Sequence, residues 1–112
     1  MIEIEKIKEY TGGDEEFIAI LFDKFLSRLD ADLTILKEAA AEHDWKTVKS
    51  RTHAMLSSAR IFFWDDIIEL SVRIESDCDA PDSGQLESSV NELIALYEKT
   101  ENEIQLWKQS LT

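Results

Sequence analysis

Apolar residues recur at spacings of three and four along most of this chain, which places them on one face of an α-helix. The longest run extends from about residue 14 to residue 43 and consists of Ile18, Leu21, Phe25, Leu29, Leu33, Leu36 and Ala40. Three further stripes follow, in Val48, Thr52, Met55, Ala59 and Phe62, then in Ile67, Leu70 and Ile74, and finally in Leu86, Val90, Leu93, Tyr97, Ile104, Trp107 and Leu111. Dipeptides typical of hairpin turns, such as Asn-Gly and Asp-Gly, do not occur in the sequence. The pattern therefore predicts four long amphipathic helices and no sheet.

Turn and capping residues separate these stripes. The first ten residues predict a short helix that ends at "TGGD", where glycine supplies left-handed backbone. Aspartates of the kind that cap or charge a helix N-terminus precede the long helices, namely Asp14, Asp44, the pair Asp65 and Asp66, and Asp82. Pro81 and Gly84 interrupt the pattern before the last helix. Short connections between long helices predict an all-α fold, an antiparallel up-and-down four-helix bundle with a short extra N-terminal helix.

The length of the chain bounds the number of domains. With 112 residues, of which 44% are hydrophobic, the chain has enough apolar side chains for one core and too few residues for two ordinary domains. We therefore expect residues 1–112 to form a single domain. The aromatic residues at helical spacing are assigned to its core and not to a cofactor, and these are Phe17, Phe22, Phe25, Phe62, Tyr97 and Trp107.

The charge of the chain excludes several kinds of partner. A formal net charge of −12 repels a phosphate backbone or an anionic bilayer, so we expect no binding to nucleic acid or to membranes. The single cysteine, Cys78, forbids an internal disulfide and favours a reducing compartment. The acidic start of the sequence does not resemble a signal peptide. These features predict a cytoplasmic protein, and we expect a monomer.

His53 is the residue most suited to chemistry. At about 100° per residue, Lys49, Ser57 and Arg60 lie within about 40° of His53 on the helical wheel, whereas the apolar stripe centres about 140° away. His53 is therefore predicted to face solvent, beside small residues such as Ala54 and cations that can balance an anion. A neutral imidazole has a nitrogen lone pair that can attack an electrophile, so His53 is able to carry a phosphoryl group. An ordinary surface histidine is the simpler interpretation of the wheel alone.

The stretch "HAMLSSARIFF", residues 53 to 63, resembles the motif of histidine-containing phosphotransfer (HPt) domains of bacterial two-component phosphorelays. His53 stands in the position of the phosphorylated histidine, Met55 in an apolar position and Ser57 in the glycine-or-serine position. The resemblance also includes the segment before the motif, the "DW" at residues 44 and 45 and the apolar stripe after it. Two residues depart from the motif, because Leu56 replaces the usual lysine and Phe63 the usual glycine.

This resemblance implies a phosphorelay intermediate. His53 would accept a phosphoryl group from the aspartyl phosphate of a response-regulator receiver domain and pass it to another receiver, with a sensor or hybrid histidine kinase upstream. Such a chain is a phosphocarrier acting with its partner and not an independent enzyme. It needs no cofactor or metal of its own, and Mg²⁺ is expected in the partner receiver. Lys49, Ser57 and Arg60 are predicted to support the phosphoryl group.

The receiver-docking face is predicted from residues of the histidine helix that lie outside the apolar stripe, which are Ala54, Leu56, Ile61 and Trp64. For two of them a structural role is an open alternative, since Leu56 fits the edge of the core and Trp64 fits a packed helix end.

Two other functions remain as alternatives. A helical module that only docks a receiver or kinase domain would keep the docking surface but lose phosphotransfer, and Leu56 in place of lysine favours that hypothesis.

The second alternative is a metal-binding or di-iron bundle. Such a bundle needs Glu-x-x-His pairs, and neither histidine has glutamate three positions before it, which disfavours this function. A glycine-rich phosphate loop, a catalytic triad and zinc-ligand spacing are also missing from the sequence.

Overall fold

A computed structural model describes residues 2–112, with the backbone alone for Ser83. Within these residues the chain forms five helices and no strand, which confirms the all-helical prediction. The helices are α1 (Ile4–Thr11), α2 (Glu15–Ala41), α3 (Trp45–Ile61), α4 (Asp65–Asp77) and α5 (Ser83–Ser110). In the described part of the chain, no helix is both long enough and apolar enough to cross a membrane.

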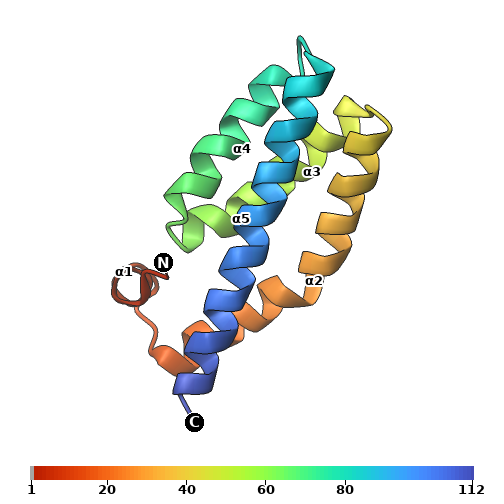
Figure 1. Cartoon of the computed structure of the whole chain (residues 1–112). Helices are drawn as coiled ribbons and strands as arrows, with labels where there is room; N and C mark the ends of the chain where they lie inside the picture. Colours follow the sequence, from red (N-terminus) through yellow and green to blue (C-terminus); the bar gives the residue numbers. More distant parts are fainter. Residues whose placement is uncertain (1) are drawn as a thin grey trace.

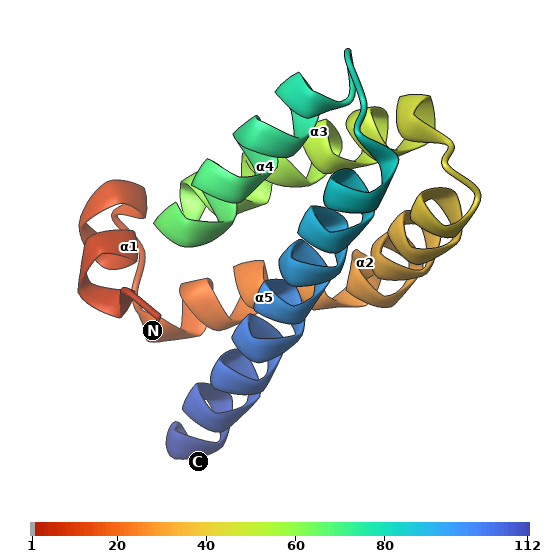
Figure 2. The same cartoon turned by 45° about the horizontal axis from the view of Figure 1, so that its top comes forward.

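Helices α2 to α5 form an up-and-down bundle, and α1 packs on α2 at one end of it (Figure 1). Helix α2 packs against α3 and α5, and α4 packs against the same two helices from the other side. Consecutive long helices run in opposite directions, and α2 changes direction partway along, as both views show (Figure 2). The molecule measures 44 × 22 × 18 Å. The predicted four-helix bundle with a short N-terminal helix is confirmed.

Aspartate side chains begin three of the four long helices, as predicted. Asp14, Asp44 and Asp82 each accept a hydrogen bond from the backbone N–H three residues later, at 2.9, 3.2 and 3.4 Å. Each bond satisfies a donor that the first turn of a helix leaves without a partner. Helix α4 starts at Asp65 without a side-chain cap, although Asp65 and Asp66 place negative charge in its first turn. The local sequence therefore determines where the helices begin.

Left-handed backbone ends three of the helices. Gly12 follows α1 with φ 70°, the conformation predicted for the "TGGD" turn. His43 follows α2 with φ 56°, and Phe63 follows α3 with φ 59°. A side chain in this conformation costs about 1–2 kcal/mol, which explains why glycine suits the position of Phe63. The ring of Phe63 contacts the ring of Tyr10 edge to face, with 5.5 Å between the centroids, and this contact offsets part of that cost.

The core runs the length of the bundle and is richest in aromatic rings near α1. Phe22 has no exposed surface and packs against Phe62, Trp64 and Trp107, with ring centroids 4.7, 6.4 and 5.5 Å away. The assignment of Phe17 to the core was wrong, because 42% of its surface is exposed. Phe17 lies in the first turn of α2, next to the turn that joins α1 to α2. The aromatic cluster joins the ends of α2, α3 and α5 into one unit.

Replacing Phe22 by alanine is expected to destabilise the fold by about 3–5 kcal/mol, since it leaves a cavity among three aromatic neighbours. Urea unfolding followed by circular dichroism measures the loss. The matched control is Ile20→Ala, also on α2 but 50% exposed, for which a change within about 0.5 kcal/mol is expected. Equal losses for the two variants would contradict this placement of the core.

The cap of α3 is expected to weaken in acid. Hydrogen bonds from the hydroxyl and the backbone N–H of Thr47 lower the pKa of Asp44 from its ordinary value of 3.8. A lowered pKa in the folded state means that the stabilisation is complete above the unfolded value and disappears as the pH falls through the folded one. The stability difference between the parent and Asp44→Ala should therefore be constant near neutral pH and shrink below about pH 3.8. A difference that persists to the lowest pH at which both proteins fold would disprove the role of the charge.

Candidate functional site

His53 projects from α3 into solvent, as the helical wheel predicted. Its side chain is 71% exposed, although the same helix buries Val48, Met55 and Ala59 on its inner face. A histidine at this position does not disturb the core, because it lies outside the apolar arc of α3 that is buried. A partner can therefore reach the imidazole directly.

Glu75 on α4 orients the ring of His53. Its Oε1 lies 2.8 Å from Nδ1 of His53, and its side chain is only 18% exposed. Because a carboxylate can only accept a hydrogen bond, Nδ1 must carry the proton and donate it. This leaves Nε2 as the ring nitrogen with a free lone pair, directed away from Glu75. Sequence analysis missed Glu75, which is 22 positions from His53 and reaches it only through the packing of α4 on α3.

The three residues predicted to support a phosphoryl group lie on the same side of α3 as His53, but their side chains differ in availability. Arg60 is exposed, and its side chain has no hydrogen-bond or ion-pair partner among the described residues. Lys49 donates to Asp79 through Nζ at 2.7 Å, and this bond raises the pKa of Lys49. The hydroxyl of Ser57 donates to the backbone oxygen of Ala54 at 3.2 Å. Their roles toward a phosphoryl group stay predictions.

Two of the four predicted docking residues are on the surface and two are not. Ala54 and Ile61 are exposed, Ile61 to 39%. Leu56 and Trp64 are only 1% and 4% exposed, so their assignment to the docking face was wrong. Leu56 lies about 60° from His53 around α3, and His53 contacts α4 through Glu75. Trp64 packs its indole into the aromatic cluster. The open alternatives of the sequence analysis, core packing for Leu56 and helix-end packing for Trp64, are the ones observed.

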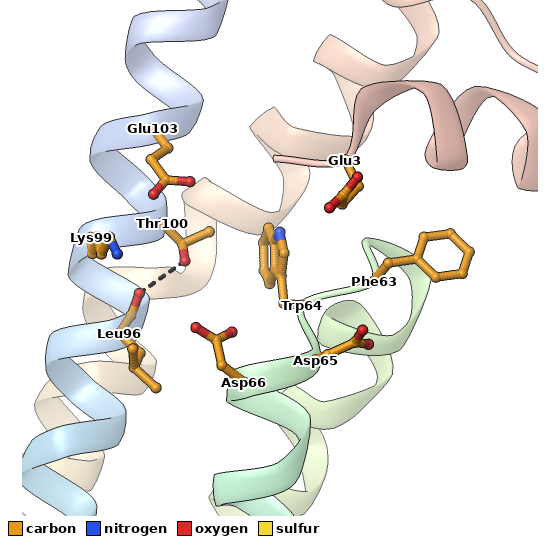
Figure 3. A pocket seen from close by; sticks show the side chains of 9 residues that line it. All are labelled: Glu3, Phe63, Trp64, Asp65, Asp66, Leu96, Lys99, Thr100 and Glu103. Atoms are coloured by element: carbon orange, nitrogen blue, oxygen red, sulfur yellow. Dashed lines mark hydrogen bonds between the residues drawn. The ribbon is translucent and has the colours of Figure 1, made fainter. Parts of the chain in front are cut away.

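A hollow of about 210 Å³ lies beyond the end of α3, and Figure 3 shows the side chains around it. Trp64 turns inward there while Phe63 points away. The hollow is lined by four carboxylates, those of Glu3, Asp65, Asp66 and Glu103, and by the ammonium of Lys99. The other lining residues are Phe63, Trp64, Leu96 and Thr100. So acidic a lining repels a phosphoryl group. This hollow therefore does not suit a phosphoryl group, and His53 stays the candidate for carrying one.

The second histidine has a different setting. His43 follows the end of α2, where its ring stacks on Trp45 at 5.2 Å and its Nε2 lies 3.3 Å from Oε2 of Glu87. Both ring contacts hold His43 against the bundle, and its Nε2 already has a partner. Of the two histidines in the sequence, His53 alone combines high exposure with an oriented ring and a free Nε2.

A helical bundle with an exposed histidine, His53, on one of its long helices is the architecture implied by the resemblance to histidine-containing phosphotransfer domains. No protein-family model matches the chain, and no solved structure matches it. Among curated proteins, the chain is similar to the phosphorelay protein LuxU of Vibrio harveyi, with 26% identity over 105 residues. The match covers 94% of this chain and 90% of that protein. Similarity along nearly the whole chain confirms the predicted resemblance.

The contact with Glu75 predicts the tautomer of His53. In the parent at mildly alkaline pH, the Nδ1–H form should dominate, because only this form donates to the Glu75 carboxylate. Replacement of Glu75 by alanine should return the ring to the mixture of Nδ1–H and Nε2–H tautomers of a histidine side chain in water. The ¹⁵N chemical shifts of the two ring nitrogens measure the ratio, and Glu69→Ala, an exposed carboxylate of the same helix, is the control. An unchanged ratio in the Glu75 variant would contradict the assigned contact.

Proposed function

We propose that this chain is a phosphorelay intermediate in which His53 accepts a phosphoryl group from a receiver-domain aspartyl phosphate and passes it to another receiver. The observation that carries the proposal is the exposed His53 ring whose Nδ1 is held by Glu75 at 2.8 Å. Similarity to a phosphorelay protein over 94% of the chain supports it independently.

The transfer is an in-line displacement at phosphorus. The lone pair of His53 Nε2 attacks, a P–N bond forms, and the P–O bond to the receiver aspartate breaks, so that the carboxylate leaves with its electron pair. The imidazole becomes positively charged while Nδ1 keeps its proton, and the Glu75 carboxylate stabilises that charge across the hydrogen bond. Passing the group to a second receiver reverses these steps at a new aspartate.

The chain supplies a positioned nucleophile, and the partner supplies the rest of the reaction chemistry. Magnesium held in the receiver would neutralise charge on the phosphoryl oxygens. On this side of the complex, Arg60 is exposed and free to contact them, and Lys49 can do so by releasing the exposed Asp79. The proposed partners are receiver domains and a sensor or hybrid histidine kinase, and the proposed place of action is the cytoplasm. We propose that the chain acts as a monomer.

Phosphoryl uptake tests the proposal. The parent and His53→Gln are mixed separately with phosphorylated receiver domains, and the label is followed by gel and by intact mass. The parent should gain one phosphoryl group that is stable in base and labile in acid, as a phosphoramidate is. His53→Gln should gain none, and His43→Gln should behave as the parent.

Uptake by the His53 variant would disprove the assignment of the nucleophile. Binding of receivers without any uptake by the parent would instead favour the alternative function of a module that only docks. The specific observation behind that alternative is Leu56, which is buried and apolar where the resembled motif has a lysine.

A further inference from the structure

Helix α3 carries a second set of polar contacts on the flank opposite His53. His53 contacts α4 through Glu75, whereas Arg51 contacts α2 through Asp32, with Nη1 donating to Oδ1 at 2.9 Å. The two positions are about 200° apart around the helix, so they lie on opposite sides of its exposed face. Ala54, which is exposed, lies between them.

A hollow of about 130 Å³ opens on this α2 flank. Its lining consists of Phe25, Arg28, Asp32, Arg51, Ala54, Met55, Ser57 and Ser58. Ala54 and Ser57 belong both to this lining and to the surface beside His53. Because an α-helix with its side chains is only about 10–12 Å across, a protein domain that covers His53 also covers the hollow.

The hollow is rich in donors and carries net positive charge. Arg28 and Arg51 bring two guanidinium groups, and the carboxylate among the lining residues, Asp32, already accepts from Arg51. Arg28 is exposed, and its side chain, like that of Ser58, has no hydrogen-bond or ion-pair partner among the described residues. In a chain of net charge −12, this local excess of cations marks a place for an anion. The planar guanidinium matches a carboxylate with two parallel hydrogen bonds.

We infer that this hollow receives an aspartate or glutamate side chain of the receiver domain that docks over His53, with Arg28 as its main contact. The inference rests on the proposed function and adds an anchoring point to it. A partner carboxylate fits better than the transferring phosphoryl group, because that group is bonded to His53 on the other flank of α3. Asp32 holds Arg51 in place, so Arg28 is the side chain left free to close on the incoming carboxylate.

The Arg28→Gln variant tests the anchor. Its dissociation constant for a receiver that phosphorylates the parent is measured by titration calorimetry at low and at high salt. We expect about tenfold weaker binding at low salt, with a smaller loss at high salt where charged contacts are screened. Arg28→Lys should recover part of the affinity, since it keeps the charge and loses the planar fork.

Arg73→Gln is the matched control, because it removes an exposed arginine from α4 that does not line the hollow. Its affinity should stay within about twofold of the parent, as expected for a charge at the rim of or outside an interface. Equal affinities for Arg28→Gln and Arg73→Gln would overturn the anchor, while phosphoryl uptake by the parent would still support the relay.

A small-molecule phosphoryl donor shows whether the anion in the hollow is a carboxylate of the receiver or the transferred phosphoryl group. Phosphoramidate can phosphorylate His53 without a receiver, as its P–N bond breaks, a bond from phosphorus to Nε2 forms and ammonia leaves. If the hollow binds a receiver carboxylate, Arg28→Gln should slow the phosphorylation of His53 by the receiver more than its phosphorylation by phosphoramidate. Equal losses with both donors would assign the hollow to the phosphoryl group itself and overturn the inference. Absence of uptake from every receiver by the parent would overturn the proposed function and the anchor with it.

Discussion

Helix α3 is packed on both sides, and this packing determines which of its side chains remain accessible to a partner. Helix α3 contacts α2 on one flank and α4 on the other, and it buries Val48, Met55 and Ala59 between them. Only an arc of the helix remains at the surface, and His53 lies at the α4 edge of that arc. The adjacent helices therefore supply the partners of its polar residues, Glu75 from α4 and Asp32 from α2.

The distribution of charge follows from the same arrangement. The chain as a whole carries −12, which would disfavour association with a receiver whose phosphorylated aspartate is also negative. Near α3 the local charge differs from that of the whole chain, because Arg28, Arg51 and Arg60 lie near the exposed arc of this helix. Most of the remaining acidic side chains lie on outer faces, where salt screens them. Under the proposed function, orientation over α3 is thus favoured and other orientations are repelled.

Helix positions were predictable because their signals are local. Apolar spacing and the caps at Asp14 and Asp44 act within a few residues, so the sequence shows them directly. The exposure of His53 was predictable for the same reason. The burial of Leu56 and the contact with Glu75 depend on how far α4 wraps around α3, which no spacing within one helix reveals. Interhelical contacts were therefore the part of the site that only the structure supplied.

The two departures from the phosphotransfer motif have physical explanations in this fold. Phe63 adopts the left-handed conformation that glycine favours, and its edge contact with Tyr10 offsets part of the cost. Leu56 lies one turn after His53 but is buried, so a cation at this position would lose its water unless its side chain extended to the surface. Positive charge near His53 must then come from the surface. Lys49 is held by an exposed carboxylate, and such pairs exchange partners at little cost. Under the proposed function, Glu75 fixes the orientation of His53, whereas the cations around it are able to change partners when a receiver domain docks.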